Sequence, residues 1–102
     1  MNVSIEKTLQ RLEALIVNKM ADYVNCGKKL GADTQLFAGG LELDSVATAE
    51  LIAVTEELFG IEFHQEDLAP ENFRTLFTLA TTITSRLIRQ RGELPEDNSE
   101  TG

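Results

Sequence analysis

The sequence is poor in the residue types that build disulfide frameworks, metal sites and membrane spans. It has 102 residues, with one cysteine, Cys26, and one histidine, His64. A lone cysteine excludes an internal disulfide and a cysteine-based zinc site, and a lone histidine excludes a multi-histidine metal site. No stretch approaches the ~20 apolar residues of a membrane span, and the N-terminus lacks the basic start of a signal peptide. We therefore expect a soluble, reduced, cytoplasmic protein without a membrane span.

Basic residues are absent from the middle of the chain. No lysine or arginine lies between Leu30 and Phe73, whereas ten aspartates and glutamates lie there, and the whole chain has a net charge of −8. Such a segment repels nucleic acid, because nucleic acid is bound by cations that face its phosphates. It attracts and steers a basic protein partner. Solubility alone is the alternative explanation of this charge.

The spacing of the apolar residues predicts helices. The chain has no tryptophan and one tyrosine, so aliphatic side chains have to fill most of the core. Apolar residues recur at spacings of three and four over residues 3–25, and again after Thr75, which is suited to cap the last helix. Gly60 is a good end for a helix over residues 45–59, and Pro70 favours a short helical turn. We predict an all-α protein, a small four-helix bundle of three main helices and one short one.

A long loop is predicted between the first two helices, over about residues 30–44. Its apolar residues are too many for a free linker, and we expect four of them to pin the loop onto the core: Leu36, Phe37, Leu41 and Leu43. Residues 1–91 form one domain. The polar residues 92–102 lack periodicity, and we expect a disordered tail there.

The predicted second helix has one face for the core and a second face left over. At about 100° per residue, the core face comprises Ala47, Leu51, Ile52, Val54, Leu58 and Phe59. The other face is a strip of small apolar side chains edged by three carboxylates: Val46, Ala49, Glu50, Ala53, Glu56 and Glu57. A small apolar centre with a charged rim is typical of a transient docking site for a basic protein surface. Helix propensity and solubility would also explain this strip.

Ser45 follows Asp44 at the point where the loop becomes this helix, and three uses of its hydroxyl are open. A hydrolase needs a base, and His64 is the only imidazole, but the glycine elbow of serine hydrolases is missing around Ser45. Either Asp44 or Ser45 is suited to cap the helix, which needs no further function. A phosphate ester on Ser45 would be stabilised by the unpaired N–H groups and the positive dipole end at the helix start.

The stretch GLELDSVATAELIAVTEELFGIEF resembles the attachment motif and second helix of acyl and peptidyl carrier proteins. The shared features are Asp44-Ser45-Val46, Glu50-Leu51, Glu56-Glu57 and Phe59-Gly60, and the later ENFRTLFTLATTI resembles the approach to the family's last helix. The resemblance covers about residues 5–90. Leu43, Val46, Ala47 and Ala49 depart from the housekeeping fatty-acid branch. The LELDSV form and the PENFRT segment resemble those of free-standing carriers of specialised pathways, including carriers charged with amino acids by dedicated ligases.

The resemblance implies that Ser45 carries 4′-phosphopantetheine, transferred from coenzyme A by a phosphopantetheinyl transferase that reads Asp44. The thiol of the arm would hold an acyl or aminoacyl cargo as a thioester. The carrier is then not itself an enzyme, and Cys26 is only a small buried or partly buried residue. The strip on the second helix would dock the transferase, an acyl or aminoacyl ligase and downstream biosynthetic enzymes. We expect a monomer. The alternative is an acidic helical interaction module without an arm.

Overall fold

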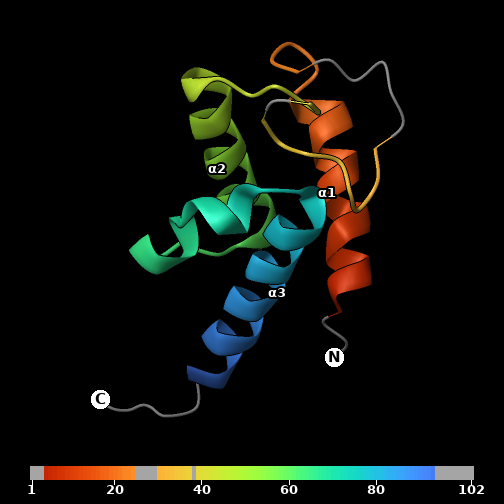
Figure 1. Ribbon diagram of the computed structural model, residues 1–102. Helices are drawn as coiled ribbons and strands as arrows, with labels where there is room; N and C mark the ends of the chain where they lie inside the picture. The colour runs from red at the N-terminus through yellow and green to blue at the C-terminus, as the bar shows by residue number, and fades with distance from the viewer. Residues whose placement is uncertain (1–3, 25–29, 38, 94–102) are drawn as a thin grey trace.

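Three α-helices and two short 3-10 turns make up the computed structural model of the protein, which describes residues 4–24, 30–37 and 39–93, with side chains through residue 90. The elements are α1 (Ile5–Lys19), α2 (Ser45–Phe59), η1 (Gln65–Leu68), η2 (Pro70–Phe73) and α3 (Leu76–Glu93) (Figure 1). The described residues form no strand, only an isolated bridge between Gln35 and Thr75. The prediction of an all-α protein is confirmed, and η2 is the helical turn predicted after Pro70.

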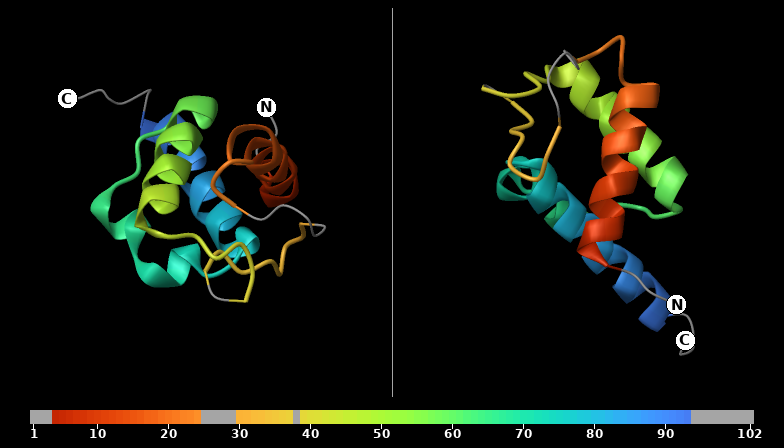
Figure 2. Two further views of the ribbon diagram at one scale, coloured as in Figure 1. Left: turned by 90° about the horizontal axis from the view of Figure 1, so that it is seen from above. Right: turned by 90° about the vertical axis from the view of Figure 1, so that its right-hand side faces the viewer.

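α1 packs against both other helices (Figure 2). Its inward residues Leu12, Leu15 and Ile16 are buried, and the apolar spacing predicted this for Leu12 and Ile16. The Thr84 hydroxyl of α3 donates a hydrogen bond to the Thr8 hydroxyl of α1 at 2.8 Å. This bond satisfies two buried polar groups at the contact between α1 and α3.

α1 ends at Lys19, earlier than the predicted residue 25. Met20 leaves the helical region at φ −114°, and its carbonyl accepts hydrogen bonds from the N–H groups of Tyr23 and Val24, which closes a turn. Met20 is buried and Val24 is partly buried against the core, so the apolar spacing runs on past the end of the helix. A pattern of apolar residues cannot distinguish this turn from another helical turn.

The segment before α2 is held on the core by three of the four apolar residues predicted to pin it. Leu36, Leu41 and Leu43 are buried, whereas Phe37 is 40% exposed, contrary to the prediction. The N–H groups of Leu41 and Leu43 donate to the carbonyls of Gln35 and Leu36, so the chain turns back on itself. Phe37 lies at the bend of this turn, where its carbonyl accepts hydrogen bonds from the N–H groups of Gly40 and Glu42.

Gly40 is required by this turn, because a Cβ atom at residue 40 would collide with the carbonyl oxygen of Gln35. The segment also crosses the start of α3, where the Leu76 N–H donates to the Thr34 carbonyl. The chain that leads into α2 is thereby tied to α3, which helps to fix where α2 begins.

α3 begins and continues largely as predicted. Thr75 caps the helix, since its hydroxyl accepts from the Thr78 N–H and the Thr78 hydroxyl accepts from the Thr75 N–H. The predicted apolar stripe is buried at Leu76, Leu79, Ala80 and Ile83. The helix runs to Glu93, two residues past the predicted boundary at residue 91, and the rest of the predicted tail, residues 94–102, lies outside the described residues.

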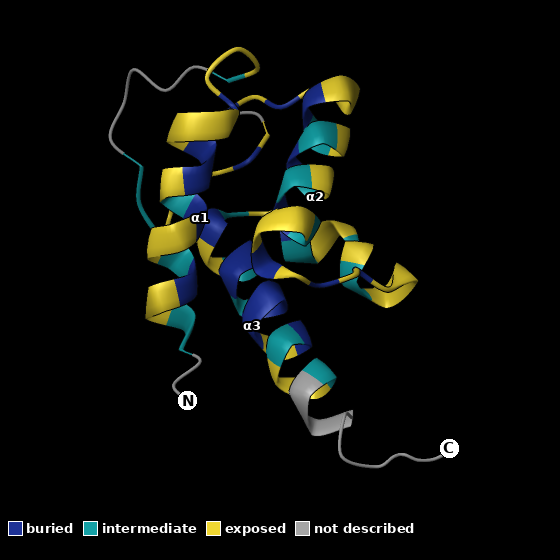
Figure 3. Cartoon of the chain, turned by 180° about the vertical axis from the view of Figure 1, so that it is seen from behind, coloured by how far each residue is buried: buried dark blue, intermediate teal, exposed yellow. Residues whose placement is uncertain are grey.

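α2 has the predicted bounds but buries a different stripe (Figure 3). Gly60 ends the helix in the left-handed conformation, φ 66°, which glycine adopts without strain. The buried residues are Ala47, Leu51, Thr55 and Phe59, spaced four apart. Leu58 was predicted to face the core but is 46% exposed, because it lies off this stripe. Ile52 and Val54 are partly buried against the core.

Candidate functional site

Ser45 is the first residue of α2, and its side chain is exposed. Asp44 is the cap: its Oδ1 accepts the hydrogen bond of the Ala47 N–H at 2.8 Å. The Asp44 carbonyl accepts from both the N–H and the hydroxyl of Thr48. Ser45 is therefore not needed as a cap, and within the described part of the chain its hydroxyl has no hydrogen-bond partner. The oxygen is left at the surface for an incoming reagent.

The start of α2 offers further hydrogen-bond donors beside Ser45. Asp44 takes the N–H of Ala47, but the N–H groups of Ser45 and Val46 meet no acceptor in residues 4–24, 30–37 and 39–93. Unpaired N–H groups and the positive end of the helix dipole both favour an anion at a helix start. A phosphate ester on the Ser45 oxygen would lie next to these groups, which would offset its repulsion by the Asp44 carboxylate.

A shallow depression lies beside Ser45, between α2 and the segment that precedes it. It is lined by Phe37, Leu43, Asp44, Ser45, Thr48, Ala49 and Ile52. Most of these side chains are apolar, and none of the described lining residues is a histidine. His64 lies beyond the opposite end of α2. Its side chain is exposed, and its backbone N–H donates a hydrogen bond to the Asp67 carboxylate. The depression therefore offers Ser45 an apolar wall rather than a general base.

The predicted docking strip lies on the outer side of α2. Val46, Ala49, Ala53 and Glu57 are exposed, and Glu50 and Glu56 are partly buried. Val46 is 67% exposed, next to Ser45, although it is a β-branched aliphatic residue. An exposed aliphatic side chain beside small alanines leaves a flat apolar surface on which a partner could pack without displacing bulky groups.

The three carboxylates of the strip differ in what they contact. The Glu56 carboxylate accepts a hydrogen bond from the Phe63 N–H at 2.9 Å, which ties the end of α2 to the chain that follows it. Glu50 and Glu57 form no ion pair with another described residue. Glu56 thus has a structural role that the helical spacing did not reveal, because Phe63 returns to it only after the turn at Gly60. Glu50 and Glu57 are the two carboxylates left for a partner.

The ion pairs of the described chain lie away from Ser45, between η1 and α3. Arg86 is 3% exposed, and its Nε donates to Asp67 Oδ2 at 2.9 Å, with Glu66 a second partner at 3.8 Å. Burial raises the pKa of Asp67, but the hydrogen bonds from Arg86 and the His64 N–H and the nearby positive charges outweigh it and hold that pKa below its ordinary value. Arg86 thus fastens η1 to α3.

The residues that the structure describes include no cluster of three or more histidine, cysteine, aspartate or glutamate side chains placed to hold a metal ion. None of the described helices combines the length and the apolar character needed to cross a membrane. Cys26 lies outside the described residues. The Ser45 side chain is exposed, and no described residue hydrogen-bonds its hydroxyl.

No protein-family model matches the sequence, and no curated protein matches it either. The resemblance to carrier proteins thus depends on the residues around Ser45 and on the geometry in which those residues lie.

Proposed function

We propose that the protein is an acyl or aminoacyl carrier protein that holds its cargo as a thioester on a 4′-phosphopantetheine arm attached to Ser45. The observation that carries the proposal is that Asp44 and Ser45 have different roles at the start of α2. Asp44 caps the helix through Oδ1, and Ser45 is exposed, with no described residue hydrogen-bonded to its hydroxyl. A serine whose hydroxyl capped the helix, or was sealed in the core, would be out of reach of a transferase.

The docking strip supports the same proposal. A carrier has to bind several enzymes briefly and release them, which calls for weak contacts steered by charge. Glu50 and Glu57 supply carboxylates that form no ion pair with a described residue, and Val46, Ala49 and Ala53 supply small exposed apolar groups on the same strip. The partners are then a phosphopantetheinyl transferase, an acyl or aminoacyl ligase and later biosynthetic enzymes, each with a basic docking surface in the cytoplasm.

The finer architecture belongs to the same proposal. In this proposal η1 and η2 correspond to the short helix of a carrier-type four-helix bundle, and the segment before α2 corresponds to the end of its long first loop. Backbone hydrogen bonds from Leu36 to Arg74 and from Leu76 to Thr34 tie that segment to the start of α3. The protein in this proposal performs no chemistry of its own, since the reactive thiol comes from the arm.

The experiment is to incubate the purified protein with coenzyme A and a broad-specificity phosphopantetheinyl transferase and to measure its intact mass. We expect a gain of about 340 Da, the mass of one phosphopantetheine ester. Ser45→Ala should gain nothing, whereas Ser85→Ala, which removes another exposed serine, should gain as much as the wild type. A wild-type mass that stays unchanged would count against the carrier function.

The alternative function is an acidic interaction module without an arm. The exposed Val46, and Glu50 and Glu57, which pair with no residue that the structure describes, favour it as much as they favour a carrier, because a docking surface does not need a prosthetic group. It predicts that the protein gains no mass and that Ser45→Ala leaves partner binding unchanged.

A further inference from the structure

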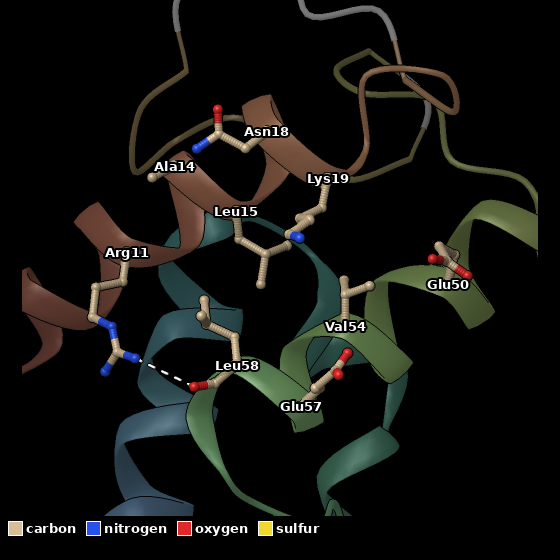
Figure 4. Close-up of a pocket in the computed structure, with 9 residues that line it drawn as sticks. All are labelled: Arg11, Ala14, Leu15, Asn18, Lys19, Glu50, Val54, Glu57 and Leu58. Atoms are coloured by element: carbon tan, nitrogen blue, oxygen red, sulfur yellow. Dashed lines mark hydrogen bonds between the residues drawn. The ribbon is translucent and has the colours of Figure 1, made fainter.

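A groove of about 700 Å³ runs between α1 and α2 on the side of the molecule shown in Figure 4. Leu15 from α1 and Val54 and Leu58 from α2 point into it, and they form its apolar floor. Leu58 is the residue that was predicted to face the core and is instead about half exposed. Its exposure follows from its place at the floor of this open groove.

The two walls of the groove carry opposite charges. Arg11 and Lys19 belong to α1, and Glu50 and Glu57 belong to α2 (Figure 4). No ion pair links these cations to these carboxylates, because the described ion pairs all join α3 to η1. The apolar floor thus separates a basic wall from an acidic wall, and no ion pair bridges them.

Arg11 is held in its place on the wall by α2. Its guanidinium lies 4.4 Å from the centre of the Phe59 ring, and one of its N–H groups donates to the Leu58 carbonyl at 3.4 Å. A cation over an aromatic face is attracted by the ring quadrupole. The basic wall is therefore a fixed feature of the contact between the two helices, while Lys19 adds an exposed cation further along it.

We infer that this groove binds an amphipathic helix of a partner protein, with an aliphatic stripe on the floor, acidic residues toward α1 and basic residues toward α2. A helix laid between two helices presents one stripe and two flanks, which matches one apolar floor and two walls. A helix that is basic on both flanks would meet Arg11 and Lys19 with like charge. The inference extends the proposed docking surface from α2 onto α1. The identity of the partner as a carrier-dependent enzyme rests on the proposed carrier function, whereas the binding of a helix in this groove does not.

Charge argues against the other occupants. A second copy of the chain carries the same net charge of −8, and repulsion between two such chains opposes their association. The chain's own residues 94–102 contain acidic residues and no lysine or arginine, so they cannot complement Glu50 and Glu57. A partner helix with both signs of charge matches both walls.

The test uses the full chain with Ser45→Ala, so that no arm is present, and three synthetic helical peptides. The first has a leucine stripe with glutamates on one flank and lysines on the other; the second has lysines on both flanks; the third replaces the leucines of the first with serine. Binding is measured by fluorescence anisotropy at about 0.15 M salt, where a Debye length of about 8 Å limits diffuse attraction. Amide chemical shifts then locate the contact. We expect the first peptide to bind most tightly and to shift amides on both α1 and α2.

Two variants test the floor and the basic wall. Leu58→Ser should weaken the first peptide about fivefold, because half of a leucine's burial is lost. Ile88→Ser, which removes a side chain that is 54% exposed on α3, should leave binding unchanged. Lys19→Glu should weaken the first peptide and strengthen the lysine-only peptide. Thermal melting would check that each variant is folded, and all three changed positions are exposed in the native protein.

Three results would overturn the inference. The second peptide, with lysines on both flanks, could bind the Ser45→Ala protein as tightly as the first peptide does. The amide shifts caused by the first peptide could also be confined to α2. Alternatively, the protein alone could shift the same amides with rising concentration and sediment as a dimer, which would make a second copy the occupant. Failure of the carrier function is seen separately, as the absence of a mass gain with coenzyme A.

Discussion

Glu57→Lys should raise the stability of the fold while it lowers the rate of loading by a partner enzyme. Glu57 lies in the last turn of α2, near the negative end of the helix dipole, and α2 has no basic residue in that turn. A carboxylate is unfavourable there, and a lysine should gain about 0.3–1 kcal/mol. If Glu57 docks a cation of the partner, its reversal removes an attraction of about 1 kcal/mol and adds a similar repulsion. The sum corresponds to about a thirtyfold loss in kcat/KM.

The assay is transfer of phosphopantetheine from coenzyme A at low salt, with thermal or urea denaturation of the same samples. Glu62→Lys is the matched control, because Glu62 is also an exposed acid but lies outside α2, and its replacement changes the net charge equally. Equal loss of loading in the two variants would mean that net charge alone matters. Normal loading of Glu57→Lys would refute the assignment of this carboxylate to the docking strip.

Glu56 should behave in the opposite way to Glu57. Its carboxylate accepts the Phe63 N–H, so Glu56→Ala should lower the free energy of unfolding by about 1–2 kcal/mol and Glu56→Gln by less; equal losses in urea denaturation would contradict that bond. Asp67→Asn should cost about 2–4 kcal/mol at pH 7, because Arg86 would stay buried with only Glu66 nearby. Since the folded pKa of Asp67 is lowered, its contribution is present above the unfolded pKa of about 3.9 and is lost as the pH falls through the folded value. The difference in Tm between Asp67→Asn and the wild type should therefore shrink as the pH is lowered from 5 to the acid limit of folding. A difference that stays constant would refute this role. Thr55→Val should stabilise the protein by about 1 kcal/mol, because the buried Thr55 hydroxyl has no partner within the described chain. A loss of stability in urea would reveal a partner for that hydroxyl.

The bounds of α2 could be read from the sequence because both of its ends are chemically marked. Asp44 caps the start and Gly60 supplies the left-handed residue at the end. The end of α1 has no such mark within residues 4–24, and the buried Met20 continues the apolar spacing into a turn. Helix spacing also could not place Leu58, because which side of α2 is covered depends on how α1 crosses it.

The exposure of Ser45 was foreseeable from its neighbour. An aspartate directly before a serine can take the capping role and leave the hydroxyl outside, as Oδ1 of Asp44 does. The role of Glu56 was not foreseeable from helical spacing, since its partner Phe63 lies beyond the turn at Gly60. The burial of Arg86 had a signal that was overlooked: it follows Ile83 by three residues on the apolar stripe of α3, where an arginine calls for a carboxylate partner.

The attachment of the arm to Ser45 is tested most directly by locating the modified residue. Protein treated with coenzyme A and a phosphopantetheinyl transferase would be digested, and the fragment containing residues 41–50 sequenced by tandem mass spectrometry. We predict that the fragment carries the ester on the Ser45 oxygen and that no other serine or threonine of the chain is modified. An unmodified Ser45 under conditions in which the transferase loads a known carrier would contradict the account.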